Sequence, residues 1–337
     1  MNPTTLTTGS VFGNVIRFSL PYLLSYFLQT LYGMADLFII GQFDGVASTT
    51  AVSIGSQVMH MLTVMIVGLA MGTTVSIARF VGAGNQKQVS ISVGNTATLF
   101  MAVSIAITAL LLLLLDPVVS AMSTPEKAMD GTASYLTICF IGIPFITAYN
   151  IIASIFRGMG DSKTPMFFIA IACVINIGLD YLFIGGMHLG AAGAALGTTI
   201  AQAISVGTAF VVIVKKKRFS IEKNDFKPRK SIMKKILSVG IPISLQDGLI
   251  QIGFIVITII ANRRGLNDAA AVGIVEKIIS FLFLVPSSML SVVSAMGAQN
   301  IGAGKPDRAV RTLRYAVLIA TGFGLICSVL EIGRAHV

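Results

Sequence analysis

An internal repeat constrains the fold of this chain more than any other feature. Gly82-Ala83-Gly84 returns as Gly302-Ala303-Gly304, and the same shift of about 220 residues aligns residues 51–54 with residues 271–274. With an offset one residue larger, Pro21 falls on Pro242. The chain is therefore a duplication, in which we expect the first copy to be whole and the second to stop early. In hydrophobic proteins such duplications are typical of transporters built from two halves.

The composition places this duplicated chain in a membrane. Hydrophobic residues make up 55% of the sequence and charged residues 11%, with a mean hydropathy of +0.86, whereas soluble domains carry about 25% charged residues. The net charge of +10 does not indicate a nucleic-acid partner, because the positive residues lie in the loops between apolar runs. The three cysteines each stand alone in an apolar run, so we interpret them as small buried side chains.

Nine apolar runs are long enough to cross a bilayer as helices. We expect an all-α membrane protein with spans at residues 17–40, 50–78, 94–115, 132–156, 165–185, 190–214, 236–261, 269–296 and 310–331. If the N-terminus is cytoplasmic, the inner segments hold nineteen Lys and Arg residues and the outer loops hold three. This imbalance predicts that orientation, in the inner (plasma) membrane.

The repeat divides the chain into two lobes. Residues 1–214 form a six-helix lobe, residues 215–235 a basic cytoplasmic linker, and residues 236–331 a second lobe with three helices. Spans two and eight run in the same direction, which predicts parallel repeats related by a two-fold axis along the membrane normal. We expect three further helices beyond this sequence. Residues 332–337 match the translation of a common sequencing adapter, so we interpret them as an artefact.

Asp36 is the first of four acids inside the spans. A charged side chain at mid-bilayer raises the free energy of insertion by about 2.5–3.5 kcal/mol. An acid inside a span is therefore expected to have a specific role. The repeat places Ile257 at the corresponding position of the second copy. Because the second copy keeps the scaffold and loses the acid, a functional role is favoured over an acid that merely reaches the outer surface.

Asn176 and Asp180 are four residues apart and share one face of the fifth span. Together with Asp36 they offer hard oxygen ligands, suited to a proton or Na⁺ and poor for a soft metal. We expect no metal site beyond this possible Na⁺ site. Two close carboxylates can also share one proton. The alternative is an Asn–Asp hydrogen bond that holds helices together. Thr198 on the sixth span can add a hydroxyl to this cluster.

A second polar group lies in the second lobe. Asp247 and Gln251 share a face of the seventh span with Gln246 beside them, and Glu276 and Lys277 are adjacent on the eighth. These residues form either a second ion site or a structural polar network. The sequence contains no nucleotide-binding loop, zinc motif or nucleophile elbow, so we expect neither an enzyme nor a cofactor.

These residues resemble the multidrug and toxic compound extrusion (MATE) family, in its prokaryotic branch. The likeness rests on Ala35-Asp36 in the proline-containing first span, Asn176-x-x-x-Asp180 in the fifth, the basic linker and the paired Gly-Ala-Gly turns. It implies two six-helix lobes around a central cleft, with Asp36, Asn176 and Asp180 in proton or sodium coupling and Thr198 nearby. Sodium-coupled relatives also pair an acid on helix seven with one on helix ten. Asp247 lies on helix seven, and helix ten is absent here.

The expected function is a monomeric secondary exporter. It exchanges inward H⁺ or Na⁺ for outward amphipathic, cationic compounds by rocker-switch motion, and the cleft needs both complete lobes. One alternative is a flippase for lipid-linked sugars, which requires a cationic cavity. The first-lobe spans hold no Lys or Arg apart from Arg17 at the first residue of the first span. The other alternative is a non-transporting membrane scaffold or receptor, which predicts binding independent of ions.

Overall fold

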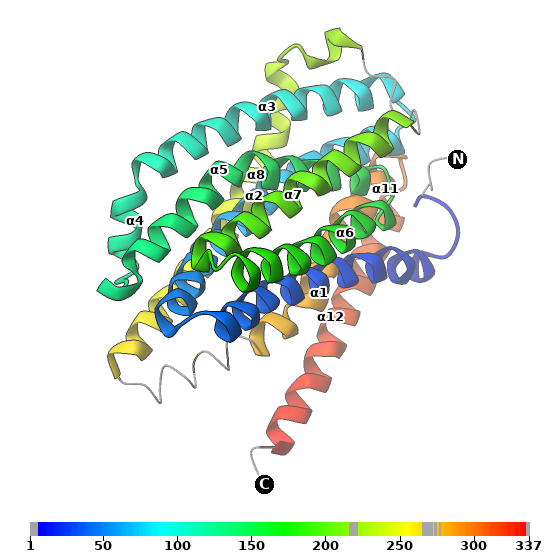
Figure 1. Ribbon diagram of the computed structural model, residues 1–337. Coiled ribbons are helices and arrows are strands. Elements are labelled where there is room, and N and C mark those ends of the chain that lie inside the picture. The colour runs from blue at the N-terminus through cyan, green and yellow to red at the C-terminus, as the bar shows by residue number, and fades with distance from the viewer. Residues whose placement is uncertain (1–5, 216–221, 265–271, 273–274, 276–277, 335–337) are drawn as a thin grey trace.

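The computed structural model describes residues 6–215, 222–264, 272, 275 and 278–334 (Figure 1). The described residues form helices joined by short turns and no strand. The helices of the first lobe are α1 (Val11–Phe43), α2 (Val46–Gly82), α3 (Gln86–Leu113), α4 (Leu115–Ala121), α5 (Glu126–Gly158), α6 (Lys163–Asp180), the π-helix η1 (Tyr181–Gly186) and α7 (Gly190–Lys215). They are followed by the 3₁₀ turn η2 (Lys223–Phe226), α8 (Lys230–Arg264), α10 (Leu284–Val292), the π-helix η3 (Val293–Gly297), α11 (Ala298–Gly302) and α12 (Pro306–Arg334).

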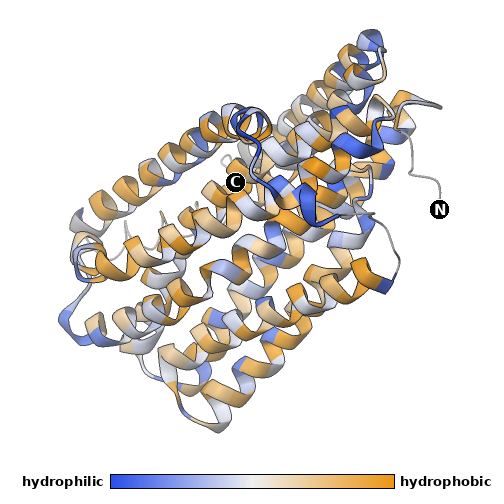
Figure 2. Ribbon diagram, turned by 90° about the horizontal axis from the view of Figure 1, so that it is seen from above, coloured by the Kyte–Doolittle hydropathy of each residue, from blue (hydrophilic) through white to orange (hydrophobic). Residues whose placement is uncertain are grey.

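The expected all-α membrane architecture is confirmed. Within the described residues, nine helical segments are long and apolar enough to cross a membrane, one for each predicted span. Apolar residues cover most of each helix, and the strongest hydrophilic colour lies mainly at turns and helix ends (Figure 2). The eighth span is described from Ile278 and continues to Gly302, six residues past its predicted end, while most of its first predicted turns lie outside the described residues.

The helices are longer than the predicted spans at the end of the bundle that carries Gly82, Gly158, Lys215 and Gly302, called the linker end below. Basic residues that we expected in loops therefore lie in terminal helical turns. Arg157 is the clearest correction. It belongs to α5, its residue is only 7% exposed, and its guanidinium carbon lies 4.6 Å from the centre of the Tyr22 ring on α1. The first-lobe helices thus hold a buried cation.

The two Gly-Ala-Gly turns that revealed the repeat have the same backbone structure. Gly84 and Gly304 both adopt φ of +69°, a left-handed conformation that favours glycine. In both turns the following residue, Asn85 or Lys305, donates its backbone N–H to a carbonyl five residues earlier. These bonds satisfy the last carbonyls of each helix and end it at the same place.

The first glycines of these turns form a reciprocal contact between α2 and α11. A Cβ atom on Gly82 would collide with the carbonyl of Gln299, and a Cβ on Gly302 would collide with the carbonyl of Arg79. Arg79 and Gln299 are themselves partners under the shift of 220 residues. Gly82 thus contacts Gln299, and their repeat mates Gly302 and Arg79 make the same contact. Such reciprocal contacts are expected for two units related by a two-fold axis.

The described lobes also meet along two pairs of longer helices. α2 packs on α8, where Gly72 and Gly240 let the backbones approach, and α1 packs on α10. Val15, Phe18 and Tyr22 of α1 belong to one buried cluster with Met289 and Val292 of α10. Small residues at such contacts let membrane helices pack closely. The lobe boundaries at residues 214 and 236 stay a prediction.

Candidate ion-coupling site

Asp36, Asn176, Asp180 and Thr198 come from three helices and form one connected polar cluster. The Thr198 hydroxyl donates to Asp36 Oδ2 at 3.2 Å, and Asn176 Nδ2 lies 3.4 Å from Thr198 Oγ1 and 3.5 Å from Asp180 Oδ1. Asp36, Asn176 and Asp180 are at most 4% exposed, and Thr198 is half-buried. The structure thus brings together all four residues that the sequence pattern predicted. Their role in coupling stays a prediction.

Local structure explains how this cluster is held. Asn176 and Asp180 lie one turn apart on α6, and the chain changes to the π-helix η1 directly after Asp180. Single π-helical turns are frequent at functional sites, because they re-aim the side chains around them. Gly197 on α7 provides the space, since a Cβ there would collide with Asp180 Oδ1. The Gly193-x-x-x-Gly197 spacing therefore serves the polar site as well as helix packing.

Several buried oxygens of this region have no hydrogen-bond partner among the described residues. They are Asp36 Oδ1, Asn176 Oδ1, Asp180 Oδ2 and Gln202 Oε1. Buried polar atoms are normally paired, so each exception calls for an explanation. All four are hard acceptors, the type that binds Na⁺ or, on a carboxylate, a proton. The donor set therefore fits a coupling ion.

The site has members that our sequence analysis missed. Tyr32 and Tyr135 lie within electrostatic range of Asp36, and Gln202, beside Tyr32, contributes an unpaired oxygen. Tyr32 was predictable, because it precedes Asp36 by four residues on the same helix. Tyr135 was not, since it comes from α5, which no spacing in the sequence connects to Asp36. No sequence spacing connects Gln202 to α1 either.

The second-lobe polar residues do not form a comparable cluster among the described residues. Asp247 is half-buried against α2, where a Cβ on Gly68 would lie 3.0 Å from its Oδ2 atom. Gln251 is half-buried and Gln246 is exposed. Glu276 and Lys277 lie outside the described residues. Within the described part of the chain, no three His, Cys, Asp or Glu residues are grouped as a metal would require.

Comparison with known proteins decides the family. The MatE family model matches residues 21–182 and 242–335. The chain belongs to the MatE family. The two matched segments begin at Pro21 and Pro242, the pair that the internal repeat aligns, so each segment covers one copy.

Individual relatives agree with this assignment. The chain is 32% identical over 304 residues to "Probable multidrug resistance protein YpnP" of Bacillus subtilis (strain 168), a match covering 90% of this chain and 68% of that protein. It is 25% identical to "Multidrug export protein MepA" of Staphylococcus haemolyticus (strain JCSC1435), over 97% of this chain and 73% of that one. The resemblance to MATE transporters is thus confirmed, and this chain spans roughly two thirds to three quarters of these relatives' lengths.

Solved structures show the same fold. An outward-facing multidrug resistance MATE transporter of the MOP superfamily superposes with a TM-score of 0.88 over 98% of this chain and 74% of that chain, at 24% identity. A MOP superfamily transporter from Pyrococcus furiosus superposes with a TM-score of 0.87 over 97% of this chain and 73% of that chain, at 25% identity.

Proposed function

We propose that this protein is a secondary antiporter of the plasma membrane that exports amphipathic, cationic organic compounds in exchange for H⁺ or Na⁺. The observation that carries the proposal is the buried chain of polar contacts from Asp36 through Thr198 and Asn176 to Asp180. Two ionisable acids inside a membrane domain destabilise it, so their presence indicates a functional role. The relatives named as multidrug resistance and export proteins support the substrate class.

The coupling cluster is placed so that its charge affects the contact between the lobes. Asp36 lies on α1, which packs on α6 of its own lobe and on α10 of the other. When a proton or Na⁺ neutralises the Asp36–Asp180 pair, the cluster can close around it. When the ion leaves, the two buried carboxylates repel each other and favour a wetter arrangement. An ion shifts the lobe equilibrium only by its differential affinity for the two arrangements. Pro21, within α1, removes a backbone hydrogen bond where that helix must yield.

The orientation and assembly also belong to the proposal. The linker end faces the cytoplasm, because it carries most of the Lys and Arg residues. The protein acts as a monomer, since each proposed element of the cycle lies within one chain.

Efflux measurements test the coupling assignment. In vesicles that contain the full-length protein, we expect Asp36→Asn and Asp180→Asn to lower gradient-driven efflux of a cationic dye by at least about fivefold, the lower end of typical coupling effects. An imposed pH gradient and an imposed Na⁺ gradient, applied separately, identify the ion. Asp130→Asn is the matched control, because Asp130 is an exposed acid at the start of α5.

Efflux by both variants at the rate and expression of the parent would overturn the assignment. Dye binding that is identical at acidic and alkaline pH, with and without Na⁺, would favour the non-transporting receptor. Transport of a lipid-linked pyrophosphate instead of the dye would favour the flippase.

A further inference from the structure

Two short segments at the linker end each join one lobe to the other. Residues 6–9, the N-terminal strap, precede α1 of the first lobe and bond to α11 and α12 of the second. Residues 222–229, the linker strap, precede α8 of the second lobe and lie against α3 of the first. Helices α1 and α8 are repeat mates, and α3 and α12 are repeat mates. The straps are therefore a reciprocal pair, like the Gly82 and Gly302 contacts.

The N-terminal strap is held through its backbone. Arg308 on α12 donates to the carbonyls of Gly9 at 2.9 Å and Thr8 at 3.1 Å, and Lys305 donates to Thr7 at 3.0 Å. Leu6 exchanges bonds with two side chains of α11, since its N–H donates to Gln299 at 3.3 Å and its carbonyl accepts from Asn300 at 3.3 Å. The bonds from Arg308 and Lys305 to residues 7–9 are exposed to solvent, whereas both bonds of Leu6 are buried.

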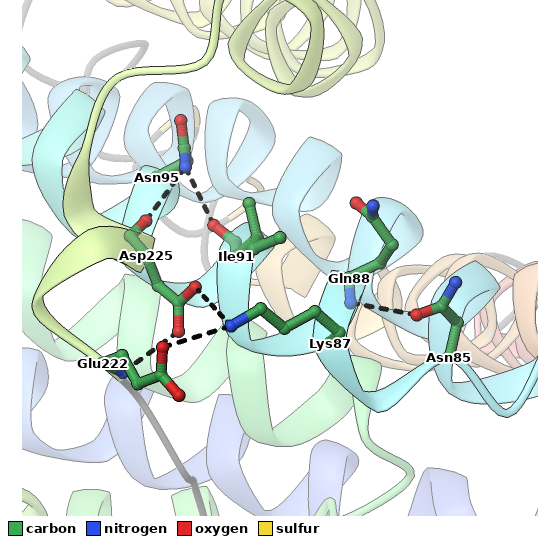
Figure 3. Close-up of polar contacts among 7 residues, drawn as sticks. All are labelled: Asn85, Lys87, Gln88, Ile91, Asn95, Glu222 and Asp225. Carbon is green, nitrogen blue, oxygen red and sulfur yellow. Dashed lines mark hydrogen bonds and ion pairs between the residues drawn. The ribbon is translucent and has the colours of Figure 1, made fainter.

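The linker strap is held against α3, and Figure 3 shows its contacts with Asn95 and Lys87. Asn95 on α3 donates to the Asp225 carbonyl at 3.1 Å and accepts the Arg229 N–H at 2.6 Å. Thr98 donates to the Phe226 carbonyl at 2.8 Å, and a Cβ on Gly94 would collide with the Asp225 carbonyl. Lys87 lies 3.6 Å from the Asp225 carboxylate and 3.4 Å from Glu222. Asn95 is 0% exposed and Asp225 1%.

Neither strap has slack. Only Ser10 separates the last bonded carbonyl of the N-terminal strap from α1, and Arg229 is directly followed by the first residue of α8. One residue spans at most about 3.3–3.6 Å. When the lobes separate at the linker end, each strap must therefore either detach or serve as the point about which the lobes turn.

Solvent access decides between these two roles. Water can replace the exposed bonds of residues 7–9 at little cost. The buried bonds of Leu6 to Gln299 and Asn300 keep the start of the N-terminal strap on α11. Detaching the linker strap would instead strand the buried amide of Asn95 and the buried carboxylate of Asp225, which is far more costly. We propose that the linker strap is a permanent pivot between the lobes. Residues 7–9 of the N-terminal strap are a latch that releases from Arg308 and Lys305 when the linker end opens, while Leu6 stays bound to α11. This inference rests on the proposed transport cycle only in requiring that opening.

Thiol labelling tests the latch without a transport assay. Ser288 on α10 is 0% exposed and donates to the Ser19 carbonyl of α1 across the lobe contact. In the full-length protein with its native cysteines replaced, a Ser288→Cys variant reports opening of the linker end. We expect Arg308→Ala to speed its labelling about tenfold, which corresponds to about 1.4 kcal/mol at 25 °C. Arg311→Ala is the matched control, an exposed arginine one turn further along the same helix. Equal labelling rates in the two variants would overturn the latch.

Reducible cross-links separate the latch from the pivot. A bifunctional thiol reagent joins cysteines introduced at Lys87 and Glu222 in one variant, and at Thr7 and Lys305 in another. We expect the first cross-link to leave dye efflux unchanged, and the second to stop it until reductant is added. Loss of efflux with the first cross-link would overturn the pivot, and full efflux with the second would overturn the latch. A parent without efflux would overturn the proposed function, while the labelling result would still decide the latch.

Discussion

At the scale of single residues, the missing Cβ of Gly197 gives Asp180 its place. Asp180 Oδ1 occupies the space where that atom would be, so the acid can stay buried beside Asn176 and within reach of Asp36. Neither the acid nor the glycine explains the site alone. The sequence pattern identified Asp180, but its direct contact with Gly197 depends on how α6 and α7 cross.

Substitution of Gly197 should therefore damage the coupling site. We expect Gly197→Ala to lower the free energy of unfolding by about 1–3 kcal/mol, the usual cost of overpacking, and to reduce ion-driven efflux as Asp180 moves. Thermal unfolding in detergent and vesicle efflux measure the two effects. Gly207→Ala on the same helix is the control, because a Cβ there meets nothing within 4 Å. If both variants unfold at the same temperature, the contact with Asp180 has no energetic role.

The buried Arg157 makes a second prediction at this scale. Its only ring partner among the described residues is Tyr22 at 4.6 Å, and a desolvated cation–π contact is worth about 2 kcal/mol. We expect Tyr22→Leu to destabilise the protein by about that amount, whereas Tyr22→Phe keeps the ring and most of the stability. Thermal unfolding of the two variants distinguishes them. Equal losses would point to the hydroxyl group instead of the ring.

At the scale of elements, the helices were predictable and their contacts were not. Long apolar runs with few charges specify membrane spans by length alone, so all nine were found. Polar residues stand out in such runs, so Asp36, Asn176, Asp180 and Thr198 were found as well. Arg157 was misplaced, because its burial depends on a contact with Tyr22 of α1 that no spacing in the sequence indicates. The straps were missed, because bonds to backbone carbonyls leave no pattern in the side chains of residues 6–9.

The crossing of α2 and α11 gives a prediction about this kind of contact. We expect Gly82→Ala to destabilise the closed linker end by about 1–3 kcal/mol, because the new methyl group would meet the Gln299 backbone, which cannot move aside as a side chain can. Faster thiol labelling of the Ser288→Cys variant would report it. Gly322→Ala, at an open position on α12, should leave the rate unchanged. An unchanged rate in both would exclude this crossing from the closure.

At the scale of the whole molecule, the described lobes meet at the linker end through a set of paired contacts. The glycine contacts are equivalent in the two copies, whereas the two straps are held by different residues and Asp36 of the first copy corresponds to Ile257 in the second. The repeat thus supplies a symmetric frame, and function is placed on the departures from that symmetry. The internal repeat predicted the two-fold arrangement of the lobes. The replacement of Asp36 by Ile257 in the second copy predicted where the two lobes differ.

The reciprocal glycine contact has a consequence for the origin of the fold. In an unduplicated ancestor that paired with a second copy of itself, a single glycine codon would have supplied both halves of the contact. Any mutation of that codon would then have altered both copies of the contact, and no substitution could have altered only one of them. Once the gene was duplicated, Gly82 and Gly302 became separate codons. Fusion of the two copies therefore did more than keep them together: it allowed each lobe to change without forcing the same change on its partner.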